Sequence, residues 1–284
     1  MRSPLVPGTS VSARRGVRRS PKQITAHLRR ALPRRDALAA LRDPQIRAEA
    51  VAGCKMISWD SVDVRVAPVA TLTSTKVESV MPVRRLGSHM NARSNLMIHT
   101  TRFSGLPTVV WAESKLEQLW MMDLDRRNDV HRYQSQACIL SWPVGEGCIL
   151  QIPDLLVAGD AGAEIISVRA EDNIGTYARA ILTELLPDTL QSHGIGYRVC
   201  GMMPRQRTVN LRLLGALRWK TPVTKESWWA PDIDVRSKKS LGAVSDMFGG
   251  GPVGRSRALR ALAQCHLDVD LDRPITQASE VAWR

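Results

Sequence analysis

The segment IPDLLVAGDAGAEIISVRAED, residues Ile152–Asp172, decides the predicted fold because it holds two apolar runs separated by a turn. Gly159-Asp-Ala-Gly162 places a glycine at each end of a short connection, which is typical of a β-hairpin. The runs on either side predict one strand over 148–157 and another over 164–170. The segment therefore predicts an antiparallel hairpin at the centre of the fold.

The second strand of this hairpin carries polar residues at alternate positions. Side chains alternate between the two faces of a strand, so we expect Ile166 and Val168 to enter the core. The other face would then hold Ser167, Arg169 and Glu171. Asp154 follows Pro153 at the start of the hairpin, where a carboxylate can point into a cleft. These polar residues are the first candidates for a functional site.

Periodicity on both sides of the hairpin predicts the rest of the core. Leu116, Leu119, Trp120 and Leu124 recur at helical spacing after Glu113. The other predicted elements are extended chain over 59–80, a strand over 132–140, a helix over 176–190, a strand over 197–200, a helix over 209–217 and an amphipathic helix after 255. This order favours an α/β fold with a mixed central sheet flanked by helices.

The chain of 284 residues is strongly basic, with 40 Lys and Arg against 27 Asp and Glu and a net charge of +13. Such an excess favours a polyanionic partner, and nucleic acid is the first candidate. The charge is concentrated at the start, so we expect a flexible basic arm over 1–58 that follows DNA phosphates without sequence specificity. A solvated tail without a specific role is the alternative. The DNA-binding candidates in the arm are Arg14, Arg15, Arg18, Arg19, Arg29 and Arg30.

The five cysteines are scattered and never form a CxxC pair, which argues against a disulfide framework or a zinc site. A reducing cytoplasm is the simpler expectation for such a chain. No apolar stretch approaches the roughly 18 residues of a membrane span, and no signal peptide is expected.

Four motifs in fixed order resemble the TnsA-type endonuclease subunit of heteromeric transposases, a member of the PD-(D/E)xK nuclease superfamily. They are Ser114-Lys-Leu-Glu117, Ser135-Gln136 followed by Cys138-Ile-Leu140, Pro153-Asp154 and Ser167-Val-Arg169. The likeness covers about residues 82–284. It implies a restriction-endonuclease-like core over 59–220. It also implies a linker with a small, mostly helical, winged-helix-like region over 221–284 that docks a partner.

The resemblance also implies a site and an activity. Glu117 and Asp154 would bind Mg²⁺, or Mn²⁺ in its place, and Val168 would add its backbone carbonyl. Oxygen ligands of this kind suit Mg²⁺. Arg169 would stabilise negative charge on the phosphate, and Gln136 would position water. The chain would hydrolyse phosphodiester bonds of double-stranded DNA at the 5′ ends of a transposon, in the bacterial cytoplasm at the nucleoid. A DDE transposase and a regulatory ATPase would be its partners.

The chain departs from the family at positions that bear on activity. Ser167 stands where relatives have Asp, Gln or Asn, and Arg169 stands where they have Lys. Arg keeps the charge but cannot release a proton near neutral pH. Glu171 is a candidate substitute ligand, and Ala137 replaces a common proline. A catalytically degraded nuclease fold that serves as a DNA-binding scaffold is therefore the alternative, and an RNA-binding protein unrelated to transposition is a third.

Overall fold

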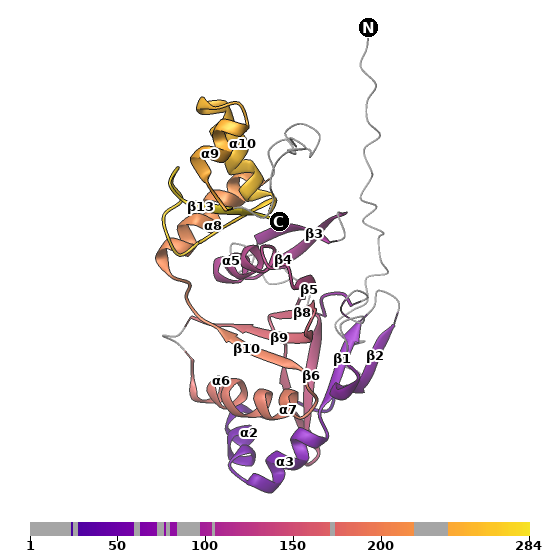
Figure 1. Cartoon of the computed structure of the whole chain (residues 1–284). Coiled ribbons are helices and arrows are strands. Elements are labelled where there is room, and N and C mark those ends of the chain that lie inside the picture. Colours follow the sequence, from indigo (N-terminus) through magenta and orange to yellow (C-terminus); the bar gives the residue numbers. More distant parts are fainter. Residues whose placement is uncertain are drawn as a thin grey trace.

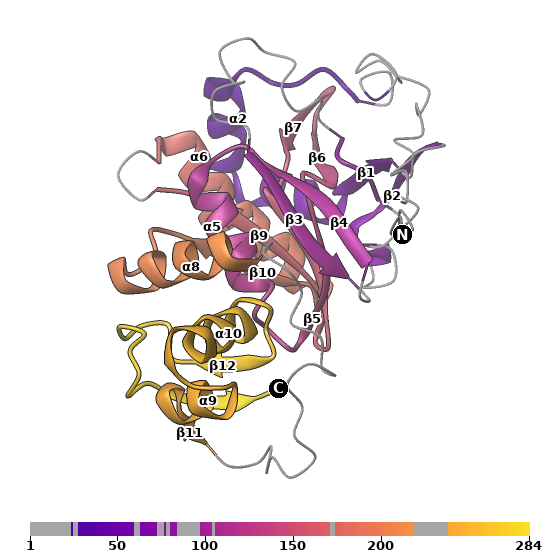
Figure 2. The same ribbon diagram turned by 90° about the horizontal axis from the view of Figure 1, so that it is seen from above.

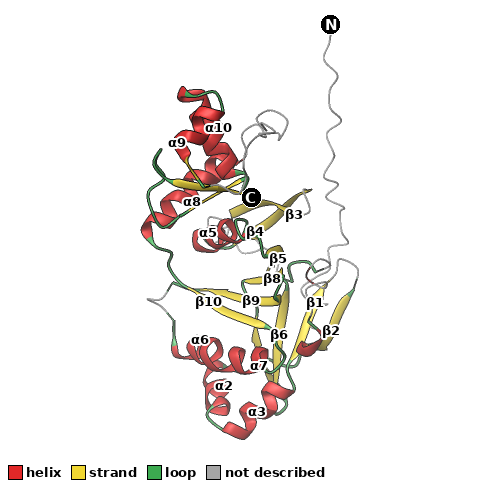
Figure 3. Cartoon of the chain, in the orientation of Figure 1, coloured by secondary structure: helices red, strands yellow, loops and turns green. Residues whose placement is uncertain are grey.

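The computed structural model describes residues 24, 28–59, 63–72, 77, 80–83, 97–103, 106–170, 174–218 and 238–284 (Figure 1). Helices and strands are interleaved through this part of the chain, so the fold belongs to the α/β class (Figure 3). The helical elements are α2 (Arg34–Leu41), α3 (Pro44–Ala52), the 3-10 turn η1 (Val69–Thr71), α5 (Lys115–Leu124), α6 (Thr176–Ala180), the π-helical turn η4 (Ile181–Leu185), α7 (Leu186–Gln191), α8 (Arg205–Arg218), α9 (Leu241–Met247) and α10 (Gly251–Ala263). The strands are β1 (Lys55–Trp59), β2 (Val64–Pro68), β3 (Met97–Phe103), β4 (Leu106–Ala112), β5 (Val130–Ser135), β6 (Cys138–Val144), β7 (Gly147–Gln151), β8 (Leu155–Gly159), β9 (Gly162–Val168), β10 (Gly196–Cys200), β11 (Lys239–Ser240), β12 (Leu267–Val269) and β13 (Glu280–Trp283).

Two four-stranded sheets form the centre of the molecule, where the sequence predicted one. The first has the order β2-β1-β6-β7 and is antiparallel throughout. The second has the order β10-β9-β8-β5 and is mixed, because β10 runs parallel to β9 while β9, β8 and β5 are antiparallel neighbours. The chain passes from the second sheet to the first between β5 and β6, and returns between β7 and β8.

These two crossings correct two strand predictions. The predicted strand over 132–140 is divided at Gln136, whose φ of 47° lies in the left-handed region and turns the chain out of the sheet. The predicted strand over 148–157 is divided at Ile152–Asp154, where Pro153 has no amide proton for a ladder hydrogen bond. The Gln136 amide donates to the Asp154 carbonyl at 3.0 Å, so the two crossings are joined.

The hairpin of β8 and β9 is confirmed. Gly159 pairs with Gly162, and Gly162 has a φ of 99°, which favours glycine at the turn. The prediction for its faces is half right. Ile166 and Val168 are buried against α5, as expected, but Ser167 is fully buried on the other face instead of lining an open surface.

Both faces of the second sheet are covered, which explains the buried serine. In Figure 1, α5 lies above β9 and β10, and α6 and α7 lie below them. Alternate residues of the hairpin therefore enter two different cores: Ile166 contributes to the cluster with Met121 and Leu124, and Ile165 to the cluster with Ile181 and Leu185. A strand buried on both faces reads as a continuous apolar run.

The helix predicted over 176–190 is present as the continuous run α6, η4 and α7. Its middle turn, Ile181–Leu185, is π-helical. Pro187 follows directly, and in a regular helix its ring would clash with the carbonyl of Thr183. The wider turn accommodates that carbonyl and lets the helix continue past the proline.

The structure differs from the expected flexible arm over 34–58. Ala37, Leu41 and Ala50 of α2 and α3 are buried in the main core, and Arg47 forms ion pairs with Glu184 and Asp188 at 3.0 and 2.9 Å. A few small or apolar residues set among the arginines, which pack into the main core, are the physical reason. Arg14, Arg15, Arg18 and Arg19 lie outside the described residues.

The C-terminal group also begins earlier than the predicted boundary at residue 220. Leu211 and Leu214 of α8 are buried with residues of α9, α10 and a three-stranded antiparallel sheet of order β11-β13-β12. Figure 2 shows this group gathered beside α8, at the opposite side of the molecule from β6 and β7. Within the part of the chain that the structure describes, no helix has the length and apolar character to cross a bilayer.

Candidate active site

Glu117 lies in the first turn of α5 and is held by a capping arrangement. The Ser114 hydroxyl accepts the Glu117 amide at 3.1 Å, and it donates to Glu117 Oε1 at 3.1 Å. Glu117 Oε2 accepts the Glu113 amide at 2.9 Å. This is a variant of the capping box, in which the carboxylate reaches back to the amide of the residue before the cap instead of the amide of the cap residue itself. Glu117 therefore has a structural role whatever its chemistry.

Burial raises the pKa of Glu117 to about 7; the hydrogen bond from the Glu113 amide opposes this shift, and the charge of Asp154 adds to it. Burial also raises the pKa of Asp154, against the lowering effect of Arg169. Glu113 raises the pKa of both acids. The effect of Asp154 on the pKa of Glu117 indicates that the two acids face the same buried region of the protein.

Asp154 lies at the second sheet crossing, between β7 and β8, and is buried. Its Oδ2 atom accepts the Val168 amide at 2.7 Å and Arg169 Nη1 at 2.7 Å. The carboxylate thus joins the start of β8 to the end of β9. Two short, charge-assisted hydrogen bonds fix its orientation.

Arg169 occupies the position that the sequence assigned to a metal ion. Its Nη1 atom contacts Asp154 Oδ2 and also donates to the Val168 carbonyl at 2.6 Å. These are two of the three predicted metal ligands. The Arg169 amide donates to the Cys200 carbonyl at 2.9 Å, which fixes the backbone, while the side chain is 32% exposed and has room to move.

Three buried polar atoms near this point make no hydrogen bond of normal geometry within the described residues. They are Ser135 Oγ, Gln136 Oε1 and Ser167 Oγ. An unpaired buried polar atom costs roughly 1–3 kcal/mol, so each requires a reason. Ser135 pairs with Leu155 in the sheet, and Gln136 is bonded to the Asp154 backbone, so two of the three lie next to the candidate site.

The candidate ligand atoms are of the type that Mg²⁺ prefers, because the carboxylates, the Val168 carbonyl and the Gln136 amide group all supply hard oxygen ligands. Among the described residues, no group of three or more His, Cys, Asp and Glu side chains could by itself hold a metal ion. A metal would therefore depend on Glu117, Asp154 and backbone or amide oxygens, and it would reach Asp154 either at Oδ1 or by displacing Arg169 from Oδ2.

The remaining predicted site residues do not all reach this place. Ser167 has no exposed surface and cannot contact a substrate in this conformation. Arg29 donates to the Gly145 carbonyl at 3.0 Å, at the end of β7 that is remote from Asp154, and Arg30 is beside it. Glu171 lies outside the described residues.

Sequence reasoning missed two features of the site. Glu113 was not among the predicted site residues, yet its charge raises the pKa of both candidate ligands. Its position one residue before the capping Ser114 was the available signal. The sequence did not indicate which acid pairs with Arg169; it pairs with Asp154, whereas Glu164 pairs with Arg198 at 3.1 Å.

Comparison of the sequence with protein-family models gives no match, and comparison with curated proteins gives none either.

Proposed function

We propose that the chain is the Mg²⁺-dependent DNA endonuclease subunit of a heteromeric transposase, built on a restriction-endonuclease-like core. The observation that supports this proposal is that Glu117 and Asp154, which lie far apart in the sequence, are both buried and that the charge of Asp154 raises the pKa of Glu117. Two carboxylates in one buried environment repel each other and are desolvated. Binding sites for divalent cations commonly contain such pairs, because the cation removes both costs.

Each residue then has a defined task. Glu117 and Asp154 would hold Mg²⁺, or Mn²⁺ in its place, together with the Val168 carbonyl. The bound ion would activate water and neutralise charge on the scissile phosphate. Arg169, released from Asp154, would hold a phosphate oxygen through its guanidinium group. The unpaired Gln136 Oε1 is suited to orient a water molecule.

The second candidate is a nuclease fold without cleavage activity that serves as a DNA-binding scaffold. The contact of Arg169 with both Asp154 Oδ2 and the Val168 carbonyl favours it. The guanidinium stays charged at any working pH, so it compensates the carboxylate as a resident cation. In this reading the chain keeps the geometry of the site but has no need of a metal.

The proposed partners are double-stranded DNA at the transposon ends, a DDE transposase that processes the 3′ ends, and a regulatory ATPase. The net charge of +13 supports a nucleic acid partner. The proposed location is the bacterial cytoplasm, at the nucleoid. An adjoining transposase gene would support the proposal over an unrelated RNA-binding protein.

The test is nicking of supercoiled DNA in Mg²⁺ by the full chain together with its transposase partner. Asp154→Asn should abolish nicking while DNA binding persists. Asp160→Asn is the matched control, because Asp160 lies in the turn of the same hairpin with its side chain 69% exposed. It should nick at the native rate. Equal nicking by all three chains would exclude Asp154 from the reaction, and DNA binding without nicking in the native chain would support the scaffold.

A further inference from the structure

The two helices α9 and α10 are joined by a three-residue turn, Phe248-Gly249-Gly250. Gly249 and Gly250 have φ values of 105° and 64°, which favour glycine at both positions. A Cβ on Gly254 of α10 would meet the Ser245 carbonyl oxygen at 2.1 Å, so the two helices are in backbone contact. A pair of short helices joined by a three-residue, glycine-containing turn is one feature of helix-turn-helix motifs.

The second helix of this pair, α10, has one buried and one exposed face. Gly254, Ala258, Ala261 and Leu262 are buried against α8, α9 and the three-stranded sheet. The exposed positions are Gly251, Pro252, Val253, Arg255, Ser256 and Arg257, and Leu259 and Arg260 are partly exposed. The buried face thus packs α10 against the rest of the C-terminal group, and the polar face is exposed to solvent.

The charge of α10 is of one sign. The helix carries three arginines and no acidic residue along its 13 positions. Arg257 uses one nitrogen to donate to the Phe248 carbonyl at 3.0 Å, which holds it along the turn, and Val253, 59% exposed, lies on the same side of the helix. Arg255, two residues before Arg257, lies about 200° away around the helix axis, where it lines a hollow with Asp246 of α9. Arginines with a small apolar residue are the groups that contact phosphates, guanine edges and thymine methyls in a major groove.

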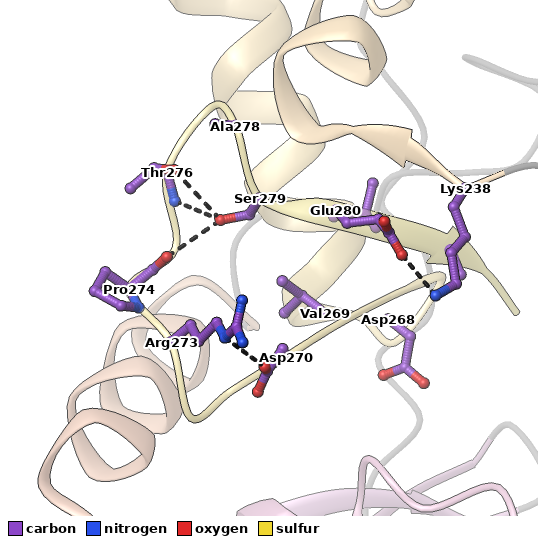
Figure 4. Close-up of a pocket in the computed structure, with 12 residues that line it drawn as sticks. Lys238, Asp268, Val269, Asp270, Arg273, Pro274, Thr276, Ala278, Ser279 and Glu280 are labelled. Carbon is purple, nitrogen blue, oxygen red and sulfur yellow. Dashed lines mark hydrogen bonds and ion pairs between the residues drawn. The ribbon is translucent and has the colours of Figure 1, made fainter.

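The neighbouring hollow does not share this charge. The loop between β12 and β13 encloses a cavity of about 930 Å³, shown in Figure 4. Lys238 and Arg273 line it together with Asp268, Asp270 and Glu280, and Lys238 and Glu280 form an ion pair at 2.6 Å. Its mixed charge gives no preference for a polyanion, so the observations favour the α10 surface.

We propose that α10 is a DNA-contacting helix that enters the major groove of double-stranded DNA, with Arg255 and Arg257 at the contact. This differs from the expectation that the C-terminal region serves only to dock a protein partner. The inference deepens the proposed function, since it names a surface for the DNA, but it does not require the carboxylates Glu117 and Asp154 to be active.

The experiment is fluorescence anisotropy of the full chain with a labelled 40-base-pair random-sequence duplex, titrated at several salt concentrations. Arg255→Gln with Arg257→Gln should weaken binding about tenfold and lower the salt dependence by about 0.9 for each lost phosphate contact. The matched control is Arg205→Gln with Arg212→Gln, which removes the same charge from exposed positions of α8. The control should keep most of the native affinity and salt slope.

Arg257 contacts the turn, so Arg255→Gln alone is the second variant, chosen because Arg255 is exposed and its loss leaves that turn contact in place. It should retain the native Tm and still bind less tightly than the α8 control. Unchanged affinity in both α10 variants, or equal loss in the α8 control, would overturn the proposal.

Asp154→Asn in the same assay separates DNA binding by α10 from the proposed nicking activity. If it loses nicking but binds normally, the α10 result is unaffected, and if the native chain never nicks, only the proposed activity fails.

Discussion

Arg169 Nη1 lies 2.7 Å from Asp154 Oδ2 and 2.6 Å from the Val168 carbonyl oxygen, so one nitrogen bridges two oxygens that the sequence assigned to a metal ion. An arginine in contact with a buried carboxylate can either yield to the ion or replace it. The two readings of the protein differ in which of these happens.

Replacing Arg169 by Gln should strengthen the binding of Mg²⁺ if the guanidinium competes for Asp154. A charge-assisted hydrogen bond contributes about 1.5–3 kcal/mol, so the gain should be about tenfold in affinity. The measurement is the rise in Tm on adding MgCl₂, compared between the native chain and the variant. Arg179→Gln, at an exposed position of α6, is the control and should respond like the native chain. A smaller Mg²⁺ response in Arg169→Gln than in the native chain would show that Arg169 helps to bind the ion.

The raised pKa of Glu117 predicts that stability falls as the pH rises. The folded chain holds the proton to a pKa of about 7, whereas the ordinary pKa of a glutamate is about 4.5, so between these pH values the folded state binds more protons than the unfolded state. The stabilisation is complete below about pH 4.5 and is lost as the pH passes 7, by a free energy of unfolding on the order of 3 kcal/mol. Urea unfolding from pH 4.5 to 8 measures it. Glu117→Gln, which can keep the capping contact to the Glu113 amide, should flatten this profile, and an unchanged slope would contradict the assignment.

Ser114 both caps α5 and orients Glu117, so its hydroxyl should matter for stability. Ser114→Ala should lower the free energy of unfolding by about 1 kcal/mol, which is the usual effect of losing an N-cap. Ser114→Thr retains a hydroxyl and should lose much less. Chemical denaturation of the two variants checks this, and an equal loss in both would mean that packing, not the cap, is responsible.

The close contact of α9 and α10 makes Gly254 sensitive to any side chain. Gly254→Ala would place a Cβ 2.1 Å from the Ser245 carbonyl oxygen, so we expect a loss of roughly 2–4 kcal/mol in the free energy of unfolding, as in overpacked cores. Gly175→Ala is the control, because its Cβ meets no atom within 4 Å. Thermal unfolding of both variants decides whether the turn geometry is as described.

The elements that the sequence predicted well are those with a complete local signal. The hairpin of β8 and β9 has glycines at its turn and apolar runs on both sides, and the helix over 176–190 has a full apolar face. The strand predicted over 132–140 failed because its alternating pattern continues while the chain changes sheets at Gln136. A local pattern records which residues alternate, but not which sheet receives them.

In the candidate site, too, some features could be predicted from the sequence and others depended on tertiary packing. The meeting of Glu117 and Asp154 could be expected from the order of the motifs, since the resemblance supplied their relative placement. The pairing of Arg169 with Asp154 could not, because several acids lie near Arg169 in the sequence and only tertiary packing selects one. The burial of Ser167 was missed for a similar reason, as it depends on the helix that covers the second face of the sheet.

The most direct measurement is Mn²⁺ binding by calorimetry to the native chain, Glu117→Gln, Asp154→Asn, the double variant and the control Asp160→Asn. If the two acids share one ion, each single variant should weaken binding about tenfold or more, and the double variant should lose little beyond either one. Asp160→Asn should bind like the native chain. Two results would contradict a shared metal site at Glu117 and Asp154. One is an Mn²⁺ affinity that is the same in all five proteins, and the other is the absence of Mn²⁺ binding both in the native chain and in the Arg169→Gln variant.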